Sequence, residues 1–392
     1  MSASSLVSAP SARSTGALPP RFAPRSRHVT ASGAPSRAAA VRSLRGARRD
    51  AMSSFTLSGL LSGWTCWAPR RVVAAGAGQG EAGAKVVCEA GDDGKMTVAV
   101  TGATGLIGSR LVAKLTAQGH AVRVLGRNLS AAQSKLPYRN VSFYGPNEWE
   151  QGVRGCTGVV NLAGEPIATR WTPALKQQIM DSRVNTTLKV VSAINGAPDD
   201  ERPEVLVSAS AVGFYGVSET QTFNEDSQSG NDYLAEVCKR WEAAAEEANT
   251  RTAIVRIGVV LAPEGGALAK MLPVFSMFAG GPLGSGSQWF SWIHRDDLVA
   301  LIIEALRDPK YEGAFNATAP RPVRMSEMCS ALGGVMGRPS WLPVPEFALK
   351  SLLGEGASVV LDGQKVLPSK AQASGFTFQY QDIDAALMNI MR

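Results

Sequence analysis

The chain has little that would serve a metal site or a disulfide framework. Its 392 residues include five cysteines and three histidines. The cysteines lie far apart and form no Cys-x-x-Cys pair, the spacing that zinc sites and redox pairs commonly use. Only His120 and His294 lie beyond the first hundred residues. We therefore expect neither a bound metal ion nor a set of structural disulfides.

Long hydrophobic runs are also missing. A membrane-spanning helix needs about 20 consecutive apolar residues. The best early stretch, residues 55–67, is too short and too rich in glycine and serine, and no later run comes near that length. The sequence therefore predicts no transmembrane segment.

Acidic residues are scarce at the start of the chain, where Asp50 is the only acid before Glu81. Serine, alanine and arginine dominate this part, which cannot bury enough apolar surface to fold. The composition matches an organellar transit peptide. We predict a disordered transit peptide over residues 1–80 and a linker over 81–94. The many serines favour the chloroplast stroma, with the mitochondrion as second choice and a retained basic tail as the alternative.

The net charge of +7 belongs to this leader. Residues 1–93 contain 12 basic and five acidic residues, whereas the rest of the chain contains 28 of each. A neutral remainder gives no electrostatic reason to bind a polyanion. We therefore expect no nucleic-acid partner.

After residue 95 the pattern alternates between short apolar runs and helical periodicity. Short strands buried on both faces, separated by helices, predict an α/β fold with a doubly wound parallel Rossmann sheet. The expected strands are 96–101, 121–125, 141–144, 158–162, 205–210 and 253–257. The expected helices begin after Gly105 and cover 147–154, 173–194 and 232–249.

The alternation fades after residue 260, where glycines cluster and Pro273 and Pro282 interrupt the pattern. We predict a small substrate subdomain here, within a nucleotide-binding domain that covers 95–343. A mostly helical C-terminal domain is expected over 344–392.

A glycine triplet follows the first strand and carries the strongest signal. Gly102 permits a tight turn, Gly105 lets the backbone approach a diphosphate, and Gly108 lets the helix pack on the strand. The helix N-terminus then presents free N–H groups to the phosphates. The alternative is a purely structural turn. The expected dinucleotide contacts here are Gly102, Thr104, Gly105, Leu106, Ile107 and Gly108.

The end of the second strand decides between NAD and NADP. An NAD site needs a carboxylate there for the ribose hydroxyls, but the position holds Arg127. A guanidinium pairs well with a 2′-phosphate, so we expect NADP, with a solvated surface arginine as the alternative. Further cofactor contacts are expected after the fourth strand, from Leu162, Ala163, Gly164, Glu165 and Arg170.

Several motifs together resemble one family. TGATGLIG, NLAGEPI, SRVNTT, SASAVGFYG, GGPLGSGSQWFSWIHRDD and LPVPEFALKSLLGE occur in this order over residues 95–392. They are similar to the atypical epimerase-family proteins of the short-chain dehydrogenase/reductase superfamily, which occur in bacteria, mitochondria and chloroplasts. The resemblance implies an NADP-binding, epimerase/dehydratase-like fold with a C-terminal domain of its own. Plant members, the SulA-like Giant Chloroplast proteins, are linked to plastid division.

The resemblance also implies a Tyr-x-x-x-Lys dyad in which a phenol acts as acid and base, and this chain departs from it. Tyr233 would need a lysine at Val237. Shifting the register by one residue places Leu234 and Cys238 in the two roles. Lys239 lies about 100° further round the helix and cannot substitute. The usual dyad is absent.

Other polar residues are weighed against structural roles. Ser210 matches the substrate-orienting serine of the superfamily, and Tyr215 is the best alternative proton donor; structural loop roles are the alternative for both. His294 is expected in a packed or capping role rather than at a substrate. Asp296 or Asp297 is expected to cap the helix that follows. The aromatic residues Trp289, Phe290 and Trp292 are interpreted as core rather than pocket wall.

Four apolar residues of the C-terminal tail have helical spacing: Phe347, Leu349, Leu352 and Leu353. Packing against the Rossmann body explains them, and a protein-binding face is the alternative. Two functions follow. The first is an NADP-dependent oxidoreductase or epimerase acting on an unidentified small molecule through Tyr215 and Ser210. The second is an inactive nucleotide sensor that a protein partner reads, for example in chloroplast division. RNA binding is disfavoured by the neutral body.

Overall fold

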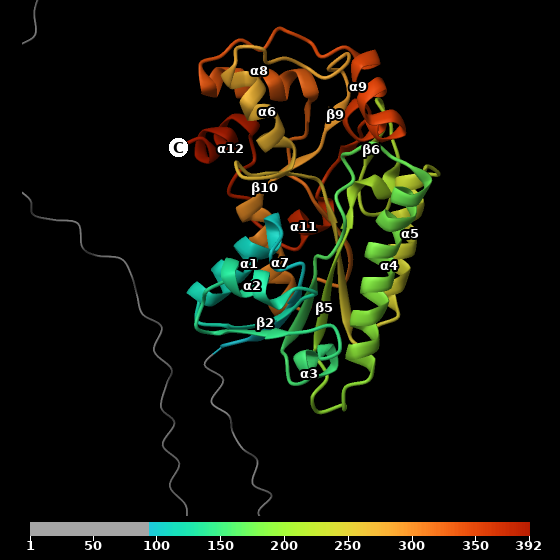
Figure 1. Ribbon diagram of the computed structural model, residues 1–392, viewed down its shortest axis with the longest axis vertical. Coiled ribbons are helices and arrows are strands. Elements are labelled where there is room, and N and C mark those ends of the chain that lie inside the picture. Colours follow the sequence, from blue (N-terminus) through green and yellow to red (C-terminus); the bar gives the residue numbers. More distant parts are fainter. Residues whose placement is uncertain (1–93) are drawn as a thin grey trace, which may run out of the picture. The chain divides into compact units, whose positions relative to one another are not determined.

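The computed structural model describes residues 94–392, which form a doubly wound α/β structure (Figure 1). Seven strands form one sheet in the order β11-β7-β5-β4-β1-β2-β3, and every neighbouring pair is parallel. The strands are β1 (Thr97–Thr101), β2 (Ala121–Leu125), β3 (Val141–Tyr144), β4 (Gly158–Asn161), β5 (Val205–Ala211), β7 (Arg251–Ile257) and β11 (Gly313–Ala317). The predicted transit peptide, and the predicted linker up to residue 93, lie outside the described residues.

Helices cover both faces of this sheet. One core joins α1, α2 and α7 to the sheet, and another joins α3, α4 and α5 to its opposite face. Their bounds are α1 (Leu106–Ala117), α2 (Leu129–Lys135), α3 (Trp149–Val153), α4 (Pro173–Asn195), α5 (Tyr233–Glu246) and α7 (Arg295–Arg307). The predicted fold class is therefore confirmed, and the observed elements match the expected ones to within a few residues at each end.

The connection from β3 to β4 crosses back over the sheet. The chain runs outward through β1, β2 and β3, and then returns to place β4 on the other side of β1. The loops after β1 and β4 therefore diverge at the carboxyl edge of the sheet. In doubly wound proteins ligands bind in the crevice that such a reversal creates.

A third core lies beyond the sheet and draws on distant parts of the chain. Leu268 and Phe275 of α6, Trp292 of β10, Leu332 of α8 and Leu387 of α12 are all fully or almost fully buried in it. The elements of this region are β8 (Val259–Leu261), α6 (Gly266–Ser276), β9 (Trp289–Phe290), β10 (Trp292–His294), β12 (Val323–Arg324), α8 (Met325–Met336), α9 (Glu346–Leu353), η2 (Gly354–Ala357), α10 (Ser358–Leu361) and α12 (Ile383–Ile390). In the part of the chain that the structure describes, no helix is both long and apolar enough to cross a membrane.

The C-terminal segment also returns to the sheet. β13 (Lys365–Val366) pairs in parallel with β6 (Thr222–Phe223), and α11 (Ser369–Ala373) packs beside β11. Thr318 Oγ1 donates a hydrogen bond to the Val366 carbonyl at 3.1 Å. Residues from the last thirty of the chain are therefore built into the body.

In this half one strand was missed and two expectations were wrong. Strand β11 was not predicted, because its sequence GAFNA is short and rich in small residues. Pro273 was expected to interrupt the pattern, yet α6 continues through it to Ser276. Phe347 and Leu352 were expected to pack inside, but they are 76% and 68% exposed, and α9 has no buried residue.

Candidate functional site

The turn between β1 and α1 can form only with glycines at two positions. Gly102 has φ +64°, a conformation that favours glycine, and a Cβ there would lie 2.6 Å from the Leu162 carbonyl oxygen. A Cβ at Gly108 would lie 2.2 Å from the Gly102 carbonyl oxygen. Gly102 thus allows the turn and the close approach of the loop after β4, and Gly108 allows α1 to pack on the turn.

The third glycine faces outward. Thr104 and Gly105 are exposed, and a Cβ at Gly105 would meet only the Gly102 carbonyl oxygen, at 3.2 Å. The first N–H groups of α1, at Leu106 and Ile107, have no acceptor within the helix, and its first turn holds no acidic residue. An open backbone and a helix N-terminus together suit a diphosphate. These residues therefore fit the dinucleotide that the sequence predicts.

A buried chain of hydrogen bonds fixes the two sides of the crevice. Thr101 Oγ1 donates to Asn161 Oδ1 at 2.6 Å, and Asn161 Nδ2 donates to Thr187 Oγ1 at 2.8 Å. The Leu162 amide donates to Thr101 Oγ1 at 3.2 Å. Strands β1 and β4 and helix α4 are thereby held in register at the site. Thr101 and Asn161 are polar residues at the ends of two apolar strands, and this pattern is a signal from which the contacts could have been predicted.

Two expected arginine contacts differ in their surroundings. The Arg127 side chain is 86% exposed at the end of β2, and its Nη2 lies 3.4 Å from Glu165 Oε1. Arg170 instead donates from Nη1 to the Ser351 carbonyl of α9 at 2.7 Å. The structure therefore brings Arg127 and Glu165 together at the edge of the crevice, whereas Arg170 is engaged by α9.

The dyad positions face the loop that follows β5. A Cβ on Gly213 of that loop would lie 3.4 Å from the Leu234 Cβ and 3.9 Å from the Cys238 sulfur. The one-residue shift therefore puts an alkyl group and a thiol where the family dyad has a phenol and an amine. Burial raises the pKa of Cys238 to about 12, so the thiol stays protonated and is not a base near neutral pH.

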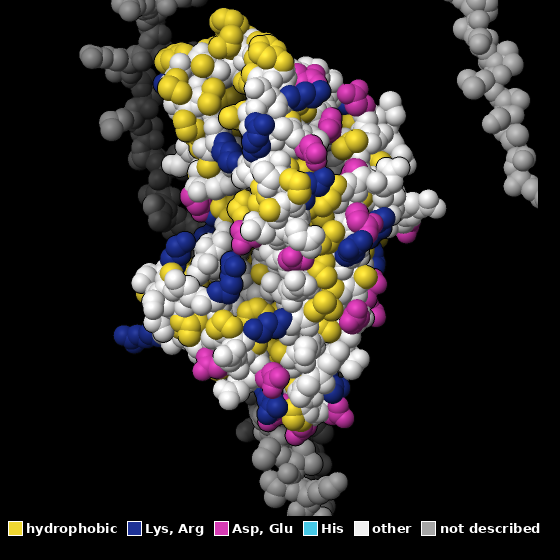
Figure 2. Space-filling view, turned by 45° about the vertical axis from the view of Figure 1, so that its right-hand side comes forward, with side chains coloured by type: hydrophobic (Ala, Val, Ile, Leu, Met, Phe, Trp, Pro, Cys, Tyr) yellow, Lys and Arg dark blue, Asp and Glu magenta, His cyan; other side chains and the backbone are white. Residues whose placement is uncertain are grey.

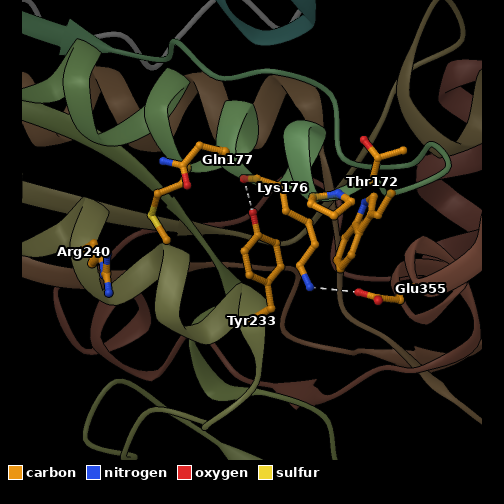
Figure 3. A pocket seen from close by; sticks show the side chains of 9 residues that line it. Thr172, Lys176, Gln177, Tyr233, Arg240 and Glu355 are labelled. Atoms are coloured by element: carbon orange, nitrogen blue, oxygen red, sulfur yellow. Dashed lines mark hydrogen bonds and ion pairs between the residues drawn. The ribbon is translucent and has the colours of Figure 1, made fainter.

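Tyr233 is held elsewhere, in a pocket of about 280 Å³ between α4, α5 and η2 (Figure 3). Its hydroxyl donates to the Lys176 carbonyl at 2.5 Å, and Lys176 Nζ pairs with Glu355 at 2.8 Å. Trp171 meets the Tyr233 ring edge-on at 5.2 Å between centroids. Tyr233 is thus tied to the first turn of α4.

Ser210 and Tyr215 belong to one buried polar network. Ser210 Oγ donates to Glu242 Oε1 at 2.5 Å, and Arg256 donates to both Glu242 oxygens at 2.9 and 2.8 Å. Arg256 Nη1 also donates to the Tyr215 hydroxyl at 3.0 Å, which in turn donates to Asn316 Oδ1 at 2.7 Å. Ser210, Arg256 and Asn316 are register partners across β5, β7 and β11.

This network limits what Tyr215 can do. Its side chain is buried and its ring stacks on Phe223 at 5.3 Å. Burial raises the pKa of Tyr215, and the neighbouring Arg256 charge offsets this only in part. The phenol therefore keeps its proton, with both hydroxyl hydrogen-bonding roles already used within the protein. Glu242, Arg256 and Asn316 were missed, although a charge inside the apolar strand RTAIVRI is a recognisable signal.

Around WIHRDD the structure confirms one interpretation and corrects another. His294 is buried and caps α7, accepting from the Asp296 amide at 3.1 Å and lying 3.9 Å from the Tyr380 ring. We had expected Asp296 or Asp297 to be the cap, and this was wrong. Asp296 pairs with Arg110 at 2.6 Å, and buried Asp297 accepts from the Gln379 and Tyr380 amides. The core interpretation of the aromatic residues is confirmed for Phe290 and Trp292.

Comparison with known families places this geometry in context. Residues 98–317 match the NAD dependent epimerase/dehydratase family. Residues 344–390 match a domain of unknown function, DUF1731. The first match covers the sheet and the glycine turn, and the second covers the segment that contains α9 to α12.

Individual relatives share most of this length. The chain is 58% identical to "Epimerase family protein SDR39U1 homolog, chloroplastic" of Arabidopsis thaliana, over 78% of this chain and 90% of the relative. It is 40% identical to "Epimerase family protein YfhF" of Bacillus subtilis, over 76% of this chain and 98% of the relative. A crystal structure of human epimerase family protein SDR39U1 (isoform 2) with NADPH superposes with a TM-score of 0.69 at 34% identity, covering 75% of this chain and 99% of the human chain.

Proposed function

The chain belongs to the NAD dependent epimerase/dehydratase family, and on that premise we propose that it is a plastid NADP(H)-binding protein with an oxidoreductase- or epimerase-type activity on a small molecule. The glycine-lined turn before α1, with Thr104 and Gly105 open to solvent, is the observation that carries the proposal. When bound, the nicotinamide would supply hydride transfer. The protein contributes the diphosphate cradle, the loop after β4 and Arg127 at the edge of the crevice.

The preference for NADP rests on Arg127. Its guanidinium is exposed at the end of β2, and its one carboxylate contact is a long, exposed pair with Glu165. Exposed pairs of this kind contribute little, so the guanidinium is free to bind a 2′-phosphate. NADPH in the human relative supports the same cofactor here.

Arg127→Ala is expected to weaken NADPH binding by about tenfold or more, equivalent to about 1.4 kcal/mol. The affinity for NADH should stay within twofold, because NADH lacks the 2′-phosphate. Fluorescence titration of residues 94–392 measures both. Lys135→Ala removes an exposed cation from nearby α2 and should change neither affinity. Equal losses for the two nucleotides would contradict the assignment.

The plastid assignment rests on two supports. Residues 1–80 have the composition of an import signal, and the Arabidopsis relative is named chloroplastic. We propose the stroma as the site of action, which imaging of a fluorescent fusion to residues 1–93 would test. A signal in mitochondria or the cytosol would overturn it.

For the reaction itself, Ser210 and Tyr215 stay our candidate proton-handling pair. If the protein turns over a substrate through them, Tyr215→Phe should lower the rate by about 10²–10⁴-fold, the usual contribution of general acid catalysis. NADPH consumption with a plastid metabolite pool provides the measurement. NADPH affinity serves as the control, because Tyr215 does not line the diphosphate cradle. An unchanged rate would remove Tyr215 from the mechanism.

The burial of Ser210 and Tyr215 favours a second candidate, a nucleotide-binding sensor read by a protein partner. Leu234 and Cys238 leave no acid or base at the dyad positions. An apolar surface for a partner is available at the end of the molecule that carries α6, α8 and α9, where hydrophobic side chains gather (Figure 2). Exposed hydrophobic residues of these elements and of the segments that follow them include Met277, Phe278, Trp341, Phe347 and Leu352.

The segment after α6 and the segment after α8 are joined by a backbone hydrogen bond. The Leu342 amide donates to the Gly280 carbonyl at 3.0 Å, which places residues 341–342 beside the end of α6.

Tight NADPH binding without turnover, together with a partner captured only in the presence of NADPH, would support the sensor. Turnover that Tyr215→Phe abolishes would support the enzyme. A role in plastid division belongs to the sensor and predicts enlarged chloroplasts when the protein is absent.

A further inference from the structure

Arg183 of α4 reaches the point where the loop after β4 meets α5. Its Nη2 donates to the Glu165 carbonyl at 3.0 Å and its Nη1 to the Ile179 carbonyl at 3.1 Å. A Cβ on Gly164 would lie only 3.1 Å from the Arg183 Cζ. The guanidinium therefore packs closely on the glycine of this loop.

The same guanidinium lies against the face of α5 that carries the altered dyad. Its Cζ is 5.3 Å from the centroid of the Trp241 ring. Trp241 is three residues beyond Cys238, so both project from the same face of the helix. Where the family dyad supplies an amine from α5, this chain has a thiol, with a cation supplied from α4 close by.

Arg183 retains capacity to bind a ligand. A guanidinium has five N–H groups. Within residues 94–392 its hydrogen bonds, including a long one from Nη1 to Ser182 Oγ at 3.5 Å, account for three of them. One N–H of Nη2 and that of Nε are left. The side chain is half-buried, and although burial lowers its pKa, arginine remains charged in proteins.

The crevice dictates which half of a dinucleotide would lie here. With the diphosphate at the α1 N-terminus and the adenosine at Arg127 beyond β2, the nicotinamide half must cross the carboxyl ends of β4 and β5. That path runs over the loop 162–165, which Arg183 supports, toward Ser210. The free N–H groups of Arg183 are well suited to the hydroxyl groups of a ribose.

We propose that Arg183 replaces the missing dyad lysine as the cation of the nicotinamide side, binding the ribose next to the nicotinamide of NADP(H). This rests on the proposed NADP(H) binding and adds a second, spatially separate determinant to it. Arg127 would recognise the adenosine end of the cofactor, and Arg183 the opposite end.

Binding of two ligands tests this. Arg183→Met should weaken NADPH by about tenfold or more, while the affinity for adenosine 2′,5′-bisphosphate, which lacks the nicotinamide ribose, stays within twofold of wild type. Arg127→Ala should weaken both ligands. Lys176→Met removes another cation of α4, one that pairs with Glu355, and should weaken neither.

Each alternative result has a distinct meaning. If Arg183→Met weakens both ligands equally or neither, Arg183 only braces the loop and the inference is wrong. If the wild-type protein binds neither ligand, the proposed function itself fails. Should Arg183→Met not fold, as judged by circular dichroism, Arg183→Gln decides: it keeps N–H donors that can brace the loop but removes the charge. A selective loss of NADPH affinity by this variant supports the inference, and unchanged affinity overturns it.

Discussion

Gly108→Ala is expected to abolish measurable NADPH binding and to lower the free energy of unfolding by about 1–3 kcal/mol, the usual cost of overpacking. The added Cβ would lie 2.2 Å from the Gly102 carbonyl oxygen and 2.7 Å from the Ala103 Cα. These are backbone atoms and cannot move aside as a flexible side chain would. Either α1 or the turn must shift, and in both cases the N–H groups that receive the diphosphate are displaced.

A matched control is available in α8. Gly334 is also a helical glycine with no positive φ, and a Cβ there would meet nothing within 4 Å. Gly334→Ala should therefore stabilise the protein by about 0.5–1 kcal/mol through helix propensity and leave NADPH affinity unchanged. Thermal melting and NADPH titration of both variants give the answer. A Gly108→Ala protein with wild-type melting and affinity would show that the tight packing of the turn does not matter.

Glu242→Ala is expected to destabilise the fold by about 3–5 kcal/mol, because removing one partner leaves a buried charge uncompensated. The side chains of Glu242 and Arg256 are 8% and 7% exposed and share two hydrogen bonds. Burial alone would lower the pKa of Arg256, but its bonds to Glu242 and the Glu242 charge raise it overall. Removing the Glu242 carboxylate would also leave the Ser210 hydroxyl without the acceptor of its hydrogen bond.

Urea unfolding measures this loss. Glu346→Ala, which breaks an exposed pair with Lys350 on α9, should leave the midpoint almost unchanged. The double variant Glu242→Leu with Arg256→Met should recover much of the lost stability, since an apolar replacement of a buried pair is often neutral. A Glu242→Ala protein that unfolds at the wild-type midpoint would show that the network contributes little to the fold.

The parts of the fold that followed from sequence were those with local signals. Strand-helix alternation and glycine spacing lie within short windows of the sequence. Strand β11 gave no such signal, because its position is decided by pairing with β7, more than fifty residues earlier in the chain. The prediction of the α7 cap was wrong for a similar reason. Asp296 accepts a hydrogen bond from Arg110, and Asp297 accepts from the amides of the two residues after Phe378, all of them distant in the sequence.

The same distinction between local signals and distant contacts applies to the residues of the candidate site. The cradle residues follow from the glycine turn, and NADPH in the human relative agrees with the cofactor expected from Arg127. Arg183 and Glu242, in contrast, act across helices α4 and α5, and their partners are a loop carbonyl and a strand arginine. Periodicity shows which face of a helix is polar but does not identify what that face meets.

The threading of the last residues into the body constrains how the molecule is made. Val366 and Leu387 belong to clusters that also contain residues synthesised long before them, such as Tyr215 and Leu261. While these final residues are still inside the ribosome, those earlier side chains have nothing to close over them. These clusters therefore stay open until residues 366–387 have left the ribosome, and a stop codon between residues 344 and 366 should yield a product that cells degrade.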